Sequence, residues 1–506
     1  MSEVRRKISL SFLLLLLTIT AAAQDVVFKR GCRVGTPRPE GTALRRTAEG
    51  GQTKLTGGDF YHGERHQLTI LAAFNDRTFK DSVNVAATMA QWDKIFNTRN
   101  LSEAPFKGSV HDYFYDQSYG NFDLTFDLQY VQVKGDAVKY ASDDLDENSQ
   151  YLVQDIMEVL KTRDIDWSLY DWNGDGFVNQ LLIVYAGHGM NDTSGPDMIW
   201  PHQWWMSEHF KDRQPHVYCD PIPVTYGGKE YKVDCYCALA ELTKNGDYGS
   251  FGTLCHEYTH CFGFPDFYSQ GKSYVGSWEL MDAGNYNGGG YSPAGYSAHE
   301  RWKMGWLTPS ELKEATTITD LAALSDKPQA YLIRNDGYEN EYYIVENRQQ
   351  KGWDAHIPGN GIIVFHIDYD PALWVSVKSY VNNSSRQHYL IFPANNVSST
   401  SLIYSKNWSY PYQDNNSLTD TSKPAAQLWH ARSDTILLMS KPLTNMAVDS
   451  TGLASFDFMK ETSAIHTVKS TSVANEQWFD LQGRQLPGRP QRKGLYIVNG
   501  RKMFVR

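Results

Sequence analysis

Residues 256–260 read His-Glu-Tyr-Thr-His and combine two metal-binding imidazoles with a carboxylate. On an α-helix, residues four positions apart lie on one face, about 40° apart around the axis, so His256 and His260 can bind one ion. Glu257 lies roughly 100° from His256, beside that face rather than over it. The spacing predicts a helix that offers two metal ligands, with Glu257 as general base for a metal-activated water.

The residues after His260 predict that this helix ends and turns. Gly263 can adopt the positive φ that terminates a helix without steric cost. Pro265 prevents the helix from resuming. Such a turn lets a nearby side chain approach the metal from another direction, and Asp266 stands six residues past His260.

The resulting pattern, H-E-x-x-H-x-x-G-x-x-D, resembles the metzincin consensus of zinc peptidases, with Asp in place of the third His. Met281 stands fifteen residues past Asp266 among turn-forming residues, similar to the Met-turn of those enzymes. The stretches HEYTHCFGFPDFY, SWELMDAGNY and SAHERWKMGWL resemble the secreted M6-type metallopeptidases, the immune inhibitor A family. The resemblance covers roughly residues 67–369.

This resemblance implies a metzincin-like zinc endopeptidase that is made as a zymogen and hydrolyses extracellular proteins or peptides. Carried over by position, it makes His256, His260 and Asp266 the zinc ligands, Glu257 the general base and Met281 the residue beneath the metal. Gly263 has the structural role of ending the helix.

Two other residues near the motif have alternative interpretations. Glu279 lies nineteen residues after His260, where the thermolysin-like pattern takes its third ligand. We rank it below Asp266, because Gly263 and Met281 have no purpose in that scheme. Tyr286 could donate a hydrogen bond during catalysis, but a packed aromatic explains it as well, so it stays outside the catalytic set.

A second candidate metal site lies in DWNGDGFVN, residues 171–179. Oxygen side chains at loop positions 1, 3 and 5 with Gly at position 6 form the front half of an EF-hand-type calcium loop. Position 12 is Leu182 rather than Glu, so the loop is incomplete. The alternative is a polar turn that leads into a strand. The calcium ligands would be Asp171, Asn173, Asp175, the Phe177 carbonyl and Asn179.

Hydrophobic periodicity places these motifs in an α+β chain. Strands are predicted at 67–74, 122–130 and 181–187, and helices at 82–96 and 148–162. After residue 307 the segments 341–348 and 361–368 read as strands between Gly, Pro and Asn turns. We therefore predict a peptidase domain with a twisted mixed sheet and an active-site helix, then a β-rich domain, then a small C-terminal β-module.

The predicted boundaries are a signal peptide at 1–24, a pro-segment or linker at 25–66, the catalytic domain at 67–307, the β-rich domain at 308–460 and a C-terminal module at 461–506. Arg5, Arg6 and Lys7 precede an apolar run and three alanines, which is typical of a secretory signal peptide. No other apolar run approaches the roughly 18 residues needed to span a membrane. The C-terminal tail resembles type IX sorting signals through DLQGR and KGLYIVNGRK, which implies contact with export machinery and a secreted or cell-surface location.

Composition and cysteine content narrow the function further. The net charge of −10, without a long basic run, argues against nucleic acid as a partner. Five of the six cysteines lie between residues 219 and 261, and export predicts disulfides among them with open connectivity. Cys32 in the pro-segment could hold the enzyme latent, although a cysteine without that role is the simpler interpretation. Arg45-Arg46 is a candidate processing point.

Two other classes of function remain as alternatives. A cysteine protease would use Cys255 or Cys261 with a histidine, and chelation would spare it. A secreted adhesin on an inactive protease scaffold would lack Glu257 or a ligand, and the sequence retains all of them.

Overall fold

The computed structural model describes residues 61–80, 84–141, 148–191, 193, 195–208, 219–249, 251–269, 272–374, 381–382, 386–397, 407–433, 435–460, 477–498 and 501–505. The predicted signal peptide, the predicted pro-segment up to residue 60, Cys32 and Arg45-Arg46 lie outside these residues. The chain divides into two compact units, one up to Lys460 and one from Glu461. The α+β class predicted from the sequence is confirmed.

A five-stranded sheet forms the base of the first unit, in the order β2-β1-β4-β8-β5. Its strands are β1 (Gly63–Ala73), β2 (Phe122–Gln132), β4 (Leu181–His188), β5 (His202–Trp205) and β8 (Cys235–Leu242). β1, β2, β4 and β8 are mutually parallel, and β5 runs antiparallel along β8 at the edge. β4 reads as a continuous apolar run because both faces of this central strand are covered. Each fully buried aliphatic side chain in it contributes about 2 kcal/mol.

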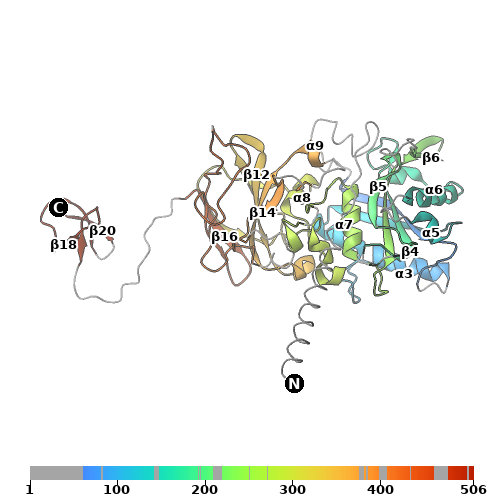
Figure 1. The fold of residues 1–506 in the computed structure, drawn as a ribbon, viewed down its shortest axis with the longest axis horizontal. Helices are drawn as coiled ribbons and strands as arrows, with labels where there is room; N and C mark the ends of the chain where they lie inside the picture. Colours follow the sequence, from blue (N-terminus) through green and yellow to red (C-terminus); the bar gives the residue numbers. More distant parts are fainter. Residues whose placement is uncertain are drawn as a thin grey trace, which may run out of the picture. The chain divides into compact units, whose positions relative to one another are not determined.

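Helices cover both faces of this sheet. They are α3 (Val85–Asn97), α4 (Val110–Gln117), α5 (Ala137–Tyr140), α6 (Ser149–Leu160) and α7 (Phe251–Cys261). Figure 1 shows α7 on one side of the sheet and α5 and α6 on the other. Local capping fixes two of the helix starts: Asn84 Oδ1 accepts from the Ala87 backbone N–H, and Ser109 and Asp112 form a capping box.

The remaining elements of this part are short. Beside the main sheet lies a three-stranded sheet of β3 (Phe177–Val178), β7 (Lys229–Val233) and β6 (Ile222–Tyr226). The 3₁₀ turns are η2 (Trp167–Tyr170), η3 (Met206–Glu208), η4 (Gly276–Trp278) and η5 (Ala283–Gly290), and helix α8 spans Ala298–Lys303.

Two further sheets follow within the same unit. The first has the order β14-β13-β12-β11-β9 and contains β9 (Ser310–Glu311), β11 (Tyr331–Asn335), β12 (Tyr338–Arg348), β13 (Gly361–Asp368) and β14 (Tyr389–Ile391). The second has the order β10-β16-β15 and contains β10 (Thr316–Leu321), β15 (Leu443–Val448) and β16 (Ala454–Phe458). Between strands lie η6 (Gly352–His356) and α9 (Pro371–Trp374).

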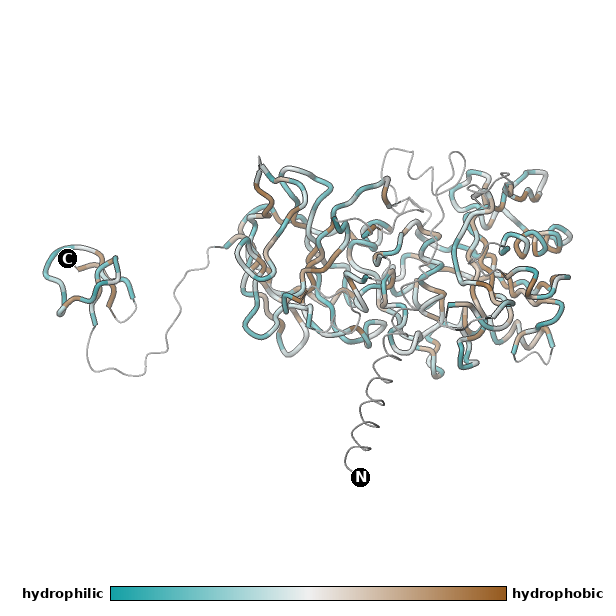
Figure 2. The backbone as a smooth tube through the Cα atoms, in the orientation of Figure 1, coloured by the Kyte–Doolittle hydropathy of each residue, from teal (hydrophilic) through white to brown (hydrophobic). Residues whose placement is uncertain are grey.

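The sheet that contains β12 and β13 is buried on both faces. Ile344 and Phe365 point into the same apolar core as the peptidase sheet. Their neighbours Val345 and Val364 point the other way, into a second core shared with β10, β15 and β16. Figure 2 shows the hydrophobic positions concentrated along the strands, with hydrophilic positions over the outer loops. The first core therefore continues across residue 308 without a break in packing.

The second unit is a small antiparallel sheet in the order β18-β17-β19-β20. Its strands are β17 (Trp478–Phe479), β18 (Gln485–Leu486), β19 (Gly494–Val498) and β20 (Arg501–Val505). Trp478, Val498 and Val505 form its core. Among the described residues, no helix is long and apolar enough to cross a bilayer.

The cysteines differ from the sequence-based prediction. Cys219, Cys235, Cys237, Cys255 and Cys261 are buried free thiols, so the disulfides predicted for them are not formed in the structure. Amide groups contact two of these sulfurs: Gln154 Nε2 donates to Cys219 Sγ at 3.8 Å, and Gln203 Nε2 donates to Cys235 Sγ at 3.2 Å. The five side chains therefore pack as small apolar residues with weak polar contacts.

Candidate metal centre

Helix α7 carries the H-E-x-x-H residues and is buried along its whole length. It packs between strand β8 and turn η5. The close approach of η5 requires Gly252, because a Cβ there would lie 1.8 Å from the Asn285 carbonyl oxygen. Strand β8 and turn η5 thus hold the helix that carries the candidate ligands from two sides.

Three predicted ligands converge at the end of α7. One ligand atom each from His256, His260 and Asp266 lies within 4.8 Å of the others, and all three residues are buried. Asp266 Oδ1 lies 3.2 Å from His256 Nε2 and 3.5 Å from His260 Nε2. The two imidazole rings stand almost perpendicular, with centroids 4.9 Å apart. Among the described residues, this is the one group of three such side chains with that spacing.

The hydrogen bonds of the histidines set their tautomers. His256 Nδ1 lies 2.8 Å from the Leu280 carbonyl oxygen, and His260 Nδ1 lies 2.7 Å from that of Phe264. A carbonyl oxygen only accepts, so each Nδ1 carries the proton and each neutral ring presents the lone pair of Nε2 to the centre. Carbonyl-anchored imidazoles of this kind are typical of metal ligands.

The donor set therefore fits a cation. Within the described part of the chain, His260 Nε2 and Asp266 Oδ2 have no hydrogen-bond partner although both are buried. Two imidazole lone pairs and a carboxylate face one another without an intervening donor, an arrangement that a divalent ion stabilises. Nitrogen and oxygen ligands in this combination are the chemistry of zinc sites.

The turn after α7 brings Asp266 back toward the helix. Gly263 has φ +93°, in the left-handed region that favours glycine. Phe267 N–H then donates to the Met281 carbonyl oxygen at 2.9 Å, which ties the strand of chain after Asp266 to the SWELMD turn. Met281 is completely buried at this point.

Electrostatics at the metal-free centre favour a charged Asp266. Burial opposes its ionisation, but the nearby His260 and His256 imidazoles hold the pKa of Asp266 below its ordinary value. Burial likewise opposes a charged His256, yet its bond to Asp266 and the nearby Glu257 raise the pKa of His256 to about 9.

Glu257 lies beside the three-ligand group and outside it. Its side chain is buried, and its Oε2 is 4.0 Å from His260 Nε2. A carboxylate adjacent to the ligands and off their face is placed to exchange a proton with a water at the centre.

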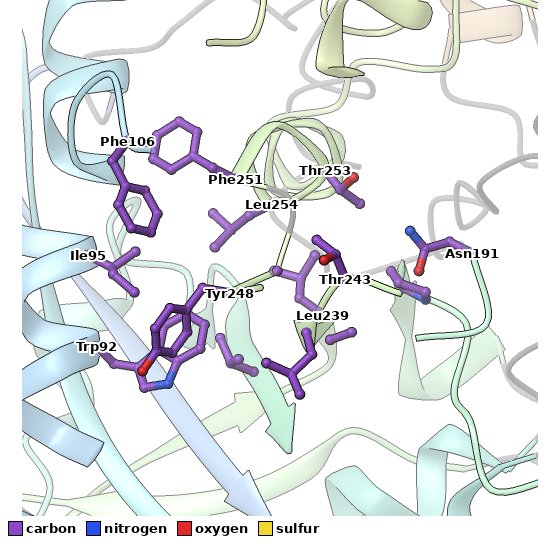
Figure 3. A pocket seen from close by; sticks show the side chains of 15 residues that line it. Trp92, Ile95, Phe106, Asn191, Leu239, Thr243, Tyr248, Phe251, Thr253 and Leu254 are labelled. Atoms are coloured by element: carbon purple, nitrogen blue, oxygen red, sulfur yellow. The ribbon is translucent and has the colours of Figure 1, made fainter. Parts of the chain in front are cut away.

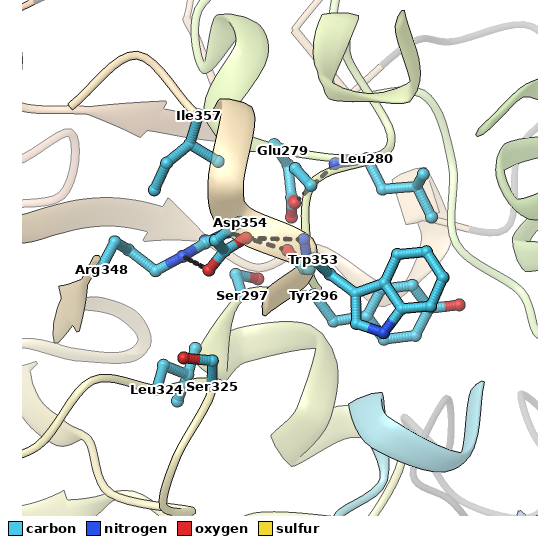
Figure 4. A network of polar contacts seen from close by, with 12 residues as sticks. Glu279, Leu280, Tyr296, Ser297, Leu324, Ser325, Arg348, Trp353, Asp354 and Ile357 are labelled. Atoms are coloured by element: carbon cyan, nitrogen blue, oxygen red, sulfur yellow. Dashed lines mark hydrogen bonds and ion pairs between the residues drawn. The ribbon is translucent and has the colours of Figure 1, made fainter. Parts of the chain in front are cut away.

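Glu279, the rival ligand, points elsewhere. Its Oε2 accepts from the Leu280 backbone N–H at 2.9 Å, and its Oε1 is 3.4 Å from Tyr389 Oη. Burial and the adjacent Glu300 carboxyl raise the pKa of Glu279 well above its ordinary value, which favours its neutral form. Figure 4 shows Glu279 near the buried ion pair of Arg348 and Asp354. The structure does not bring Glu279 into the ligand group.

The candidate calcium loop forms a compact turn. Asp171 accepts from the backbone N–H groups of Asp175 and Gly176 at 2.9 and 3.0 Å, and Asp175 accepts from that of Phe177 at 2.8 Å. Asn179 Oδ1 accepts from the Trp172 N–H. In addition, Lys229 Nζ lies 3.4 Å from Asp171 Oδ2. The side chains of the predicted ligands are therefore together, with a lysine cation at one carboxylate.

An apolar pocket lies beside the N-terminal half of α7. Figure 3 shows Phe251 and Leu254 from α7 facing Trp92 and Ile95 of α3, with Tyr248 below them. Its volume of ≈ 30 Å³ has room for about two water molecules. Separately, Tyr286 in η5 is 46% exposed, so it is not part of the buried core.

Sequence reasoning missed the groups that anchor the ligands. The carbonyls of Leu280 and Phe264 hold the two imidazoles, and Asn382 holds the backbone after Asp266. Backbone carbonyls carry no sequence signal. Asn382 lies 115 positions from the residue it binds, so no local pattern could identify it.

A parallel sheet with an antiparallel edge strand, a buried H-E-x-x-H helix and a third candidate ligand after a glycine turn are the features expected of a metal-dependent peptidase. Residues 68–307 match the family model described as the immune inhibitor A peptidase M6 catalytic domain. These residues therefore belong to the M6 family of metallopeptidases, and the resemblance stated from the motifs is confirmed. No curated protein matches the chain closely enough to count as a relative.

Proposed function

We propose that the protein is a secreted zinc endopeptidase whose ligands are His256, His260 and Asp266. The observation that carries the proposal is the donor arrangement: two imidazoles with carbonyl-anchored Nδ1 atoms and one buried carboxylate, all facing one point. The family assignment of residues 68–307 supports a peptide-bond hydrolase at this site. We therefore expect protein or peptide chains as the substrates.

Bound zinc would supply Lewis-acid activation of a water and of the scissile carbonyl. Glu257 takes a proton from the attacking water and delivers it to the nitrogen of the leaving amine. The carbonyl groups of Leu280 and Phe264 keep both imidazoles in the tautomer that faces the centre. Met281, buried next to the turn that carries Asp266, fixes the floor of the site.

Activation and export belong to the same proposal. The basic, apolar and small-residue order of residues 1–24 supports a cleaved signal peptide, and the following segment supports a zymogen. The tail forms a separate small unit from Glu461, which supports its use as an address for export machinery.

The burial of both candidate thiols argues against a cysteine-protease mechanism. Burial raises the pKa of Cys255 and of Cys261 well above the ordinary value. A protonated thiol that substrate cannot reach is a poor nucleophile. Nothing in the described chain favours the adhesin alternative, since Glu257 and all three ligands are present.

Metal analysis combined with a protein-cleavage assay on wild type and Glu257→Ala tests this function. We expect about one zinc per chain in both proteins and cleavage by the wild type only. A chelator should abolish wild-type cleavage, and zinc should restore it. Full activity in Glu257→Ala would refute the mechanism, and activity that survives chelation would favour a different catalyst.

We retain calcium as a structural proposal for Asp171, Asn173, Asp175, the Phe177 carbonyl and Asn179. Grouped oxygen atoms in a tight turn support it, while Lys229 competes for Asp171. Calcium added to chelator-treated protein should raise the melting temperature in wild type and not in Asp175→Ala. An unchanged melting temperature in both would contradict the site.

A further inference from the structure

The chain that follows Asp266 is held by a residue from beyond the peptidase domain. The Phe267 carbonyl oxygen accepts a hydrogen bond of 2.6 Å from Asn382 Nδ2. Asn382 lies 115 residues further along the chain, shortly before β14. The backbone next to the third ligand is thus tied directly to the β-rich sheet.

Asn382 is itself fixed by the strand it precedes. Its Nδ2 also donates to the Tyr389 carbonyl oxygen at 2.6 Å. Its Oδ1 accepts from the backbone N–H groups of His388 and Tyr389 at 2.8 and 2.9 Å. With both amide hydrogens and both lone pairs of this buried side chain used, its position is determined by β14.

Tyr389 adds an apolar contact to the same residue. Its ring stacks on Phe267 with centroids 3.9 Å apart and an interplanar angle of 13°. The Tyr389 hydroxyl lies 2.8 Å from Ser297 Oγ, just before α8. We call Asn382 and Tyr389 together the β14 clamp.

The peptidase domain holds the other side of Phe267. The Phe267 N–H donates to the Met281 carbonyl, and the adjacent Leu280 carbonyl anchors His256. Residues 280 and 281 therefore make two hydrogen bonds at the site. The Leu280 carbonyl accepts from the His256 imidazole, and the Met281 carbonyl accepts from the backbone N–H of the residue that follows Asp266. Figure 4 shows Glu279 and Leu280 of the SWELMD turn above Asp354 and Trp353, with Tyr296 and Ser297 below them.

The geometry points to the β14 clamp as a positioning device for Asp266, so that the β-rich region completes the metal site of the peptidase domain. This inference rests on the proposed zinc ligands. Without Asn382, the Phe267 carbonyl would be buried without a protein donor, and the turn would shift to find one. A shift of the turn moves the carboxylate relative to the two imidazoles, which α7 holds in place. Metal affinity falls as a result.

The test compares two buried asparagines in the full-length protein. Asn347 in β12 also donates to two carbonyls, those of Leu321 and Gly452, at 2.9 and 2.8 Å. It contacts neither Phe267 nor the ligands. We expect Asn382→Ala to weaken zinc affinity by about 10–100-fold, as loss of an outer-shell partner does. Asn347→Ala should lose a similar amount of stability and change zinc affinity by less than about twofold.

Zinc affinity is measured on metal-depleted protein by competition with a chromogenic chelator, so the readout does not depend on activity. Hydrogen exchange of residues 262–269 provides a second readout and should accelerate in Asn382→Ala alone. Equal zinc affinities in Asn382→Ala and Asn347→Ala would overturn the inference. Asp266→Ala is the reference: if it kept tightly bound zinc, the proposed ligand set itself would be wrong.

A second pair of variants tests the positioning role of the β14 clamp even where Asn382→Ala does not fold. Tyr389→Phe keeps the ring that stacks on Phe267 and removes only the hydroxyl, so zinc affinity should stay near that of wild type. Tyr389→Leu removes the stacked ring and should weaken zinc binding by about tenfold. Identical affinities in both variants would contradict a role for the ring.

Discussion

Two buried clusters of histidines and carboxylates lie in this molecule, one in the peptidase domain and one in the β-rich region. At the first, His256, His260 and Asp266 present acceptor atoms to one another. At the second, Glu341 on β12 and Asp368 on β13 are surrounded by donors. The three residues of the first cluster and the two carboxylates of the second are buried.

The second cluster satisfies its carboxylates with protein groups. Glu341 accepts from His366 Nε2 at 2.7 Å, from the backbone N–H groups of Trp429 and His430 at 2.5 and 2.9 Å, and from Asn335 Nδ2 at 2.9 Å. Asp368 is paired with Arg386 Nε at 2.9 Å and with two further histidines, His388 and His430. No lone pair of Glu341 is left to bind an ion.

The difference shows that histidine and carboxylate proximity alone does not make a metal site. What matters is where each Nδ1 hydrogen points. Carbonyl oxygens take those hydrogens at the first cluster and leave Nε2 atoms facing the carboxylate. In the second cluster donors point at the Glu341 carboxylate and cations flank Asp368, which makes it a structural ion-pair network.

The largest expected effect separates the clusters by metal content. Asp266→Ala should remove tightly bound zinc and lower cleavage activity by at least about 10⁴-fold, because the metal supplies several kcal/mol of transition-state stabilisation. Asp368→Ala should keep zinc and lose stability. Elemental analysis and a cleavage assay measure both, and zinc loss in Asp368→Ala but not Asp266→Ala would reverse the assignment of the two clusters.

The same substitution at two glutamates sharpens the comparison. Glu257→Gln preserves shape and removes the general base, so kcat/KM should fall by about 10²–10⁴-fold while zinc stays bound. Its melting temperature should remain close to that of wild type. Unchanged kcat/KM would exclude Glu257 as the base.

Glu341→Gln should have the opposite outcome, with activity of the folded enzyme retained and stability reduced. Burial opposes ionisation of Glu341, but His366 and backbone donors lower the pKa to about 2 from 4.5. A depressed pKa stabilises the folded state above pH 4.5, and the contribution is lost as the pH falls toward 2. This difference between the two pKa values corresponds to about 3 kcal/mol of folding free energy at neutral pH.

Urea unfolding at pH 7 and at acidic pH measures this effect. The stability gap between wild type and Glu341→Gln should be present at pH 7 and shrink steadily below pH 4.5. A gap that stays constant with pH would show that the loss comes from packing and not from the carboxylate charge.

The smallest expected effect concerns the candidate calcium loop, where the ammonium group of Lys229 lies beside the Asp171 carboxylate. Lys229 is about half exposed, so its ion pair with Asp171 contributes less than about 1 kcal/mol. Lys229→Ala should change stability little without calcium and should raise calcium affinity several-fold, as titration calorimetry would detect. Lower calcium affinity in the variant would mean that the lysine does not compete for the loop.

Much of the peptidase domain was predictable because its signals are local. The periodicity of 67–74, 122–130 and 181–187 predicts strands that the structure forms with shifted ends, as β1, β2 and β4. The helix around the H-E-x-x-H residues follows from the spacing, and Gly263 has the positive φ that its position suggests. The three proposed ligands and the proposed base all come from residues 256–266, and the structure brings them close together.

Long-range packing could not be predicted in the same way. The segments 341–348 and 361–368 between Gly, Pro and Asn turns predict strands, but this pattern does not reveal which core each face enters. Residues such as Ile344 and Val345 are equally apolar and face different cores. The prediction of disulfides from the cysteine pattern was also wrong, because five buried thiols close in sequence pack as apolar side chains.

The sheet of β12 and β13 has a consequence for how the molecule melts. Because its two faces belong to different cores, neither core can lose its packing without exposing a face of this sheet to water. Residues up to Lys460 should therefore unfold in a single calorimetric transition, and the small C-terminal unit should melt on its own. A truncated expression clone that stops at Leu307, where the family match ends, would leave an uncovered apolar surface and aggregate.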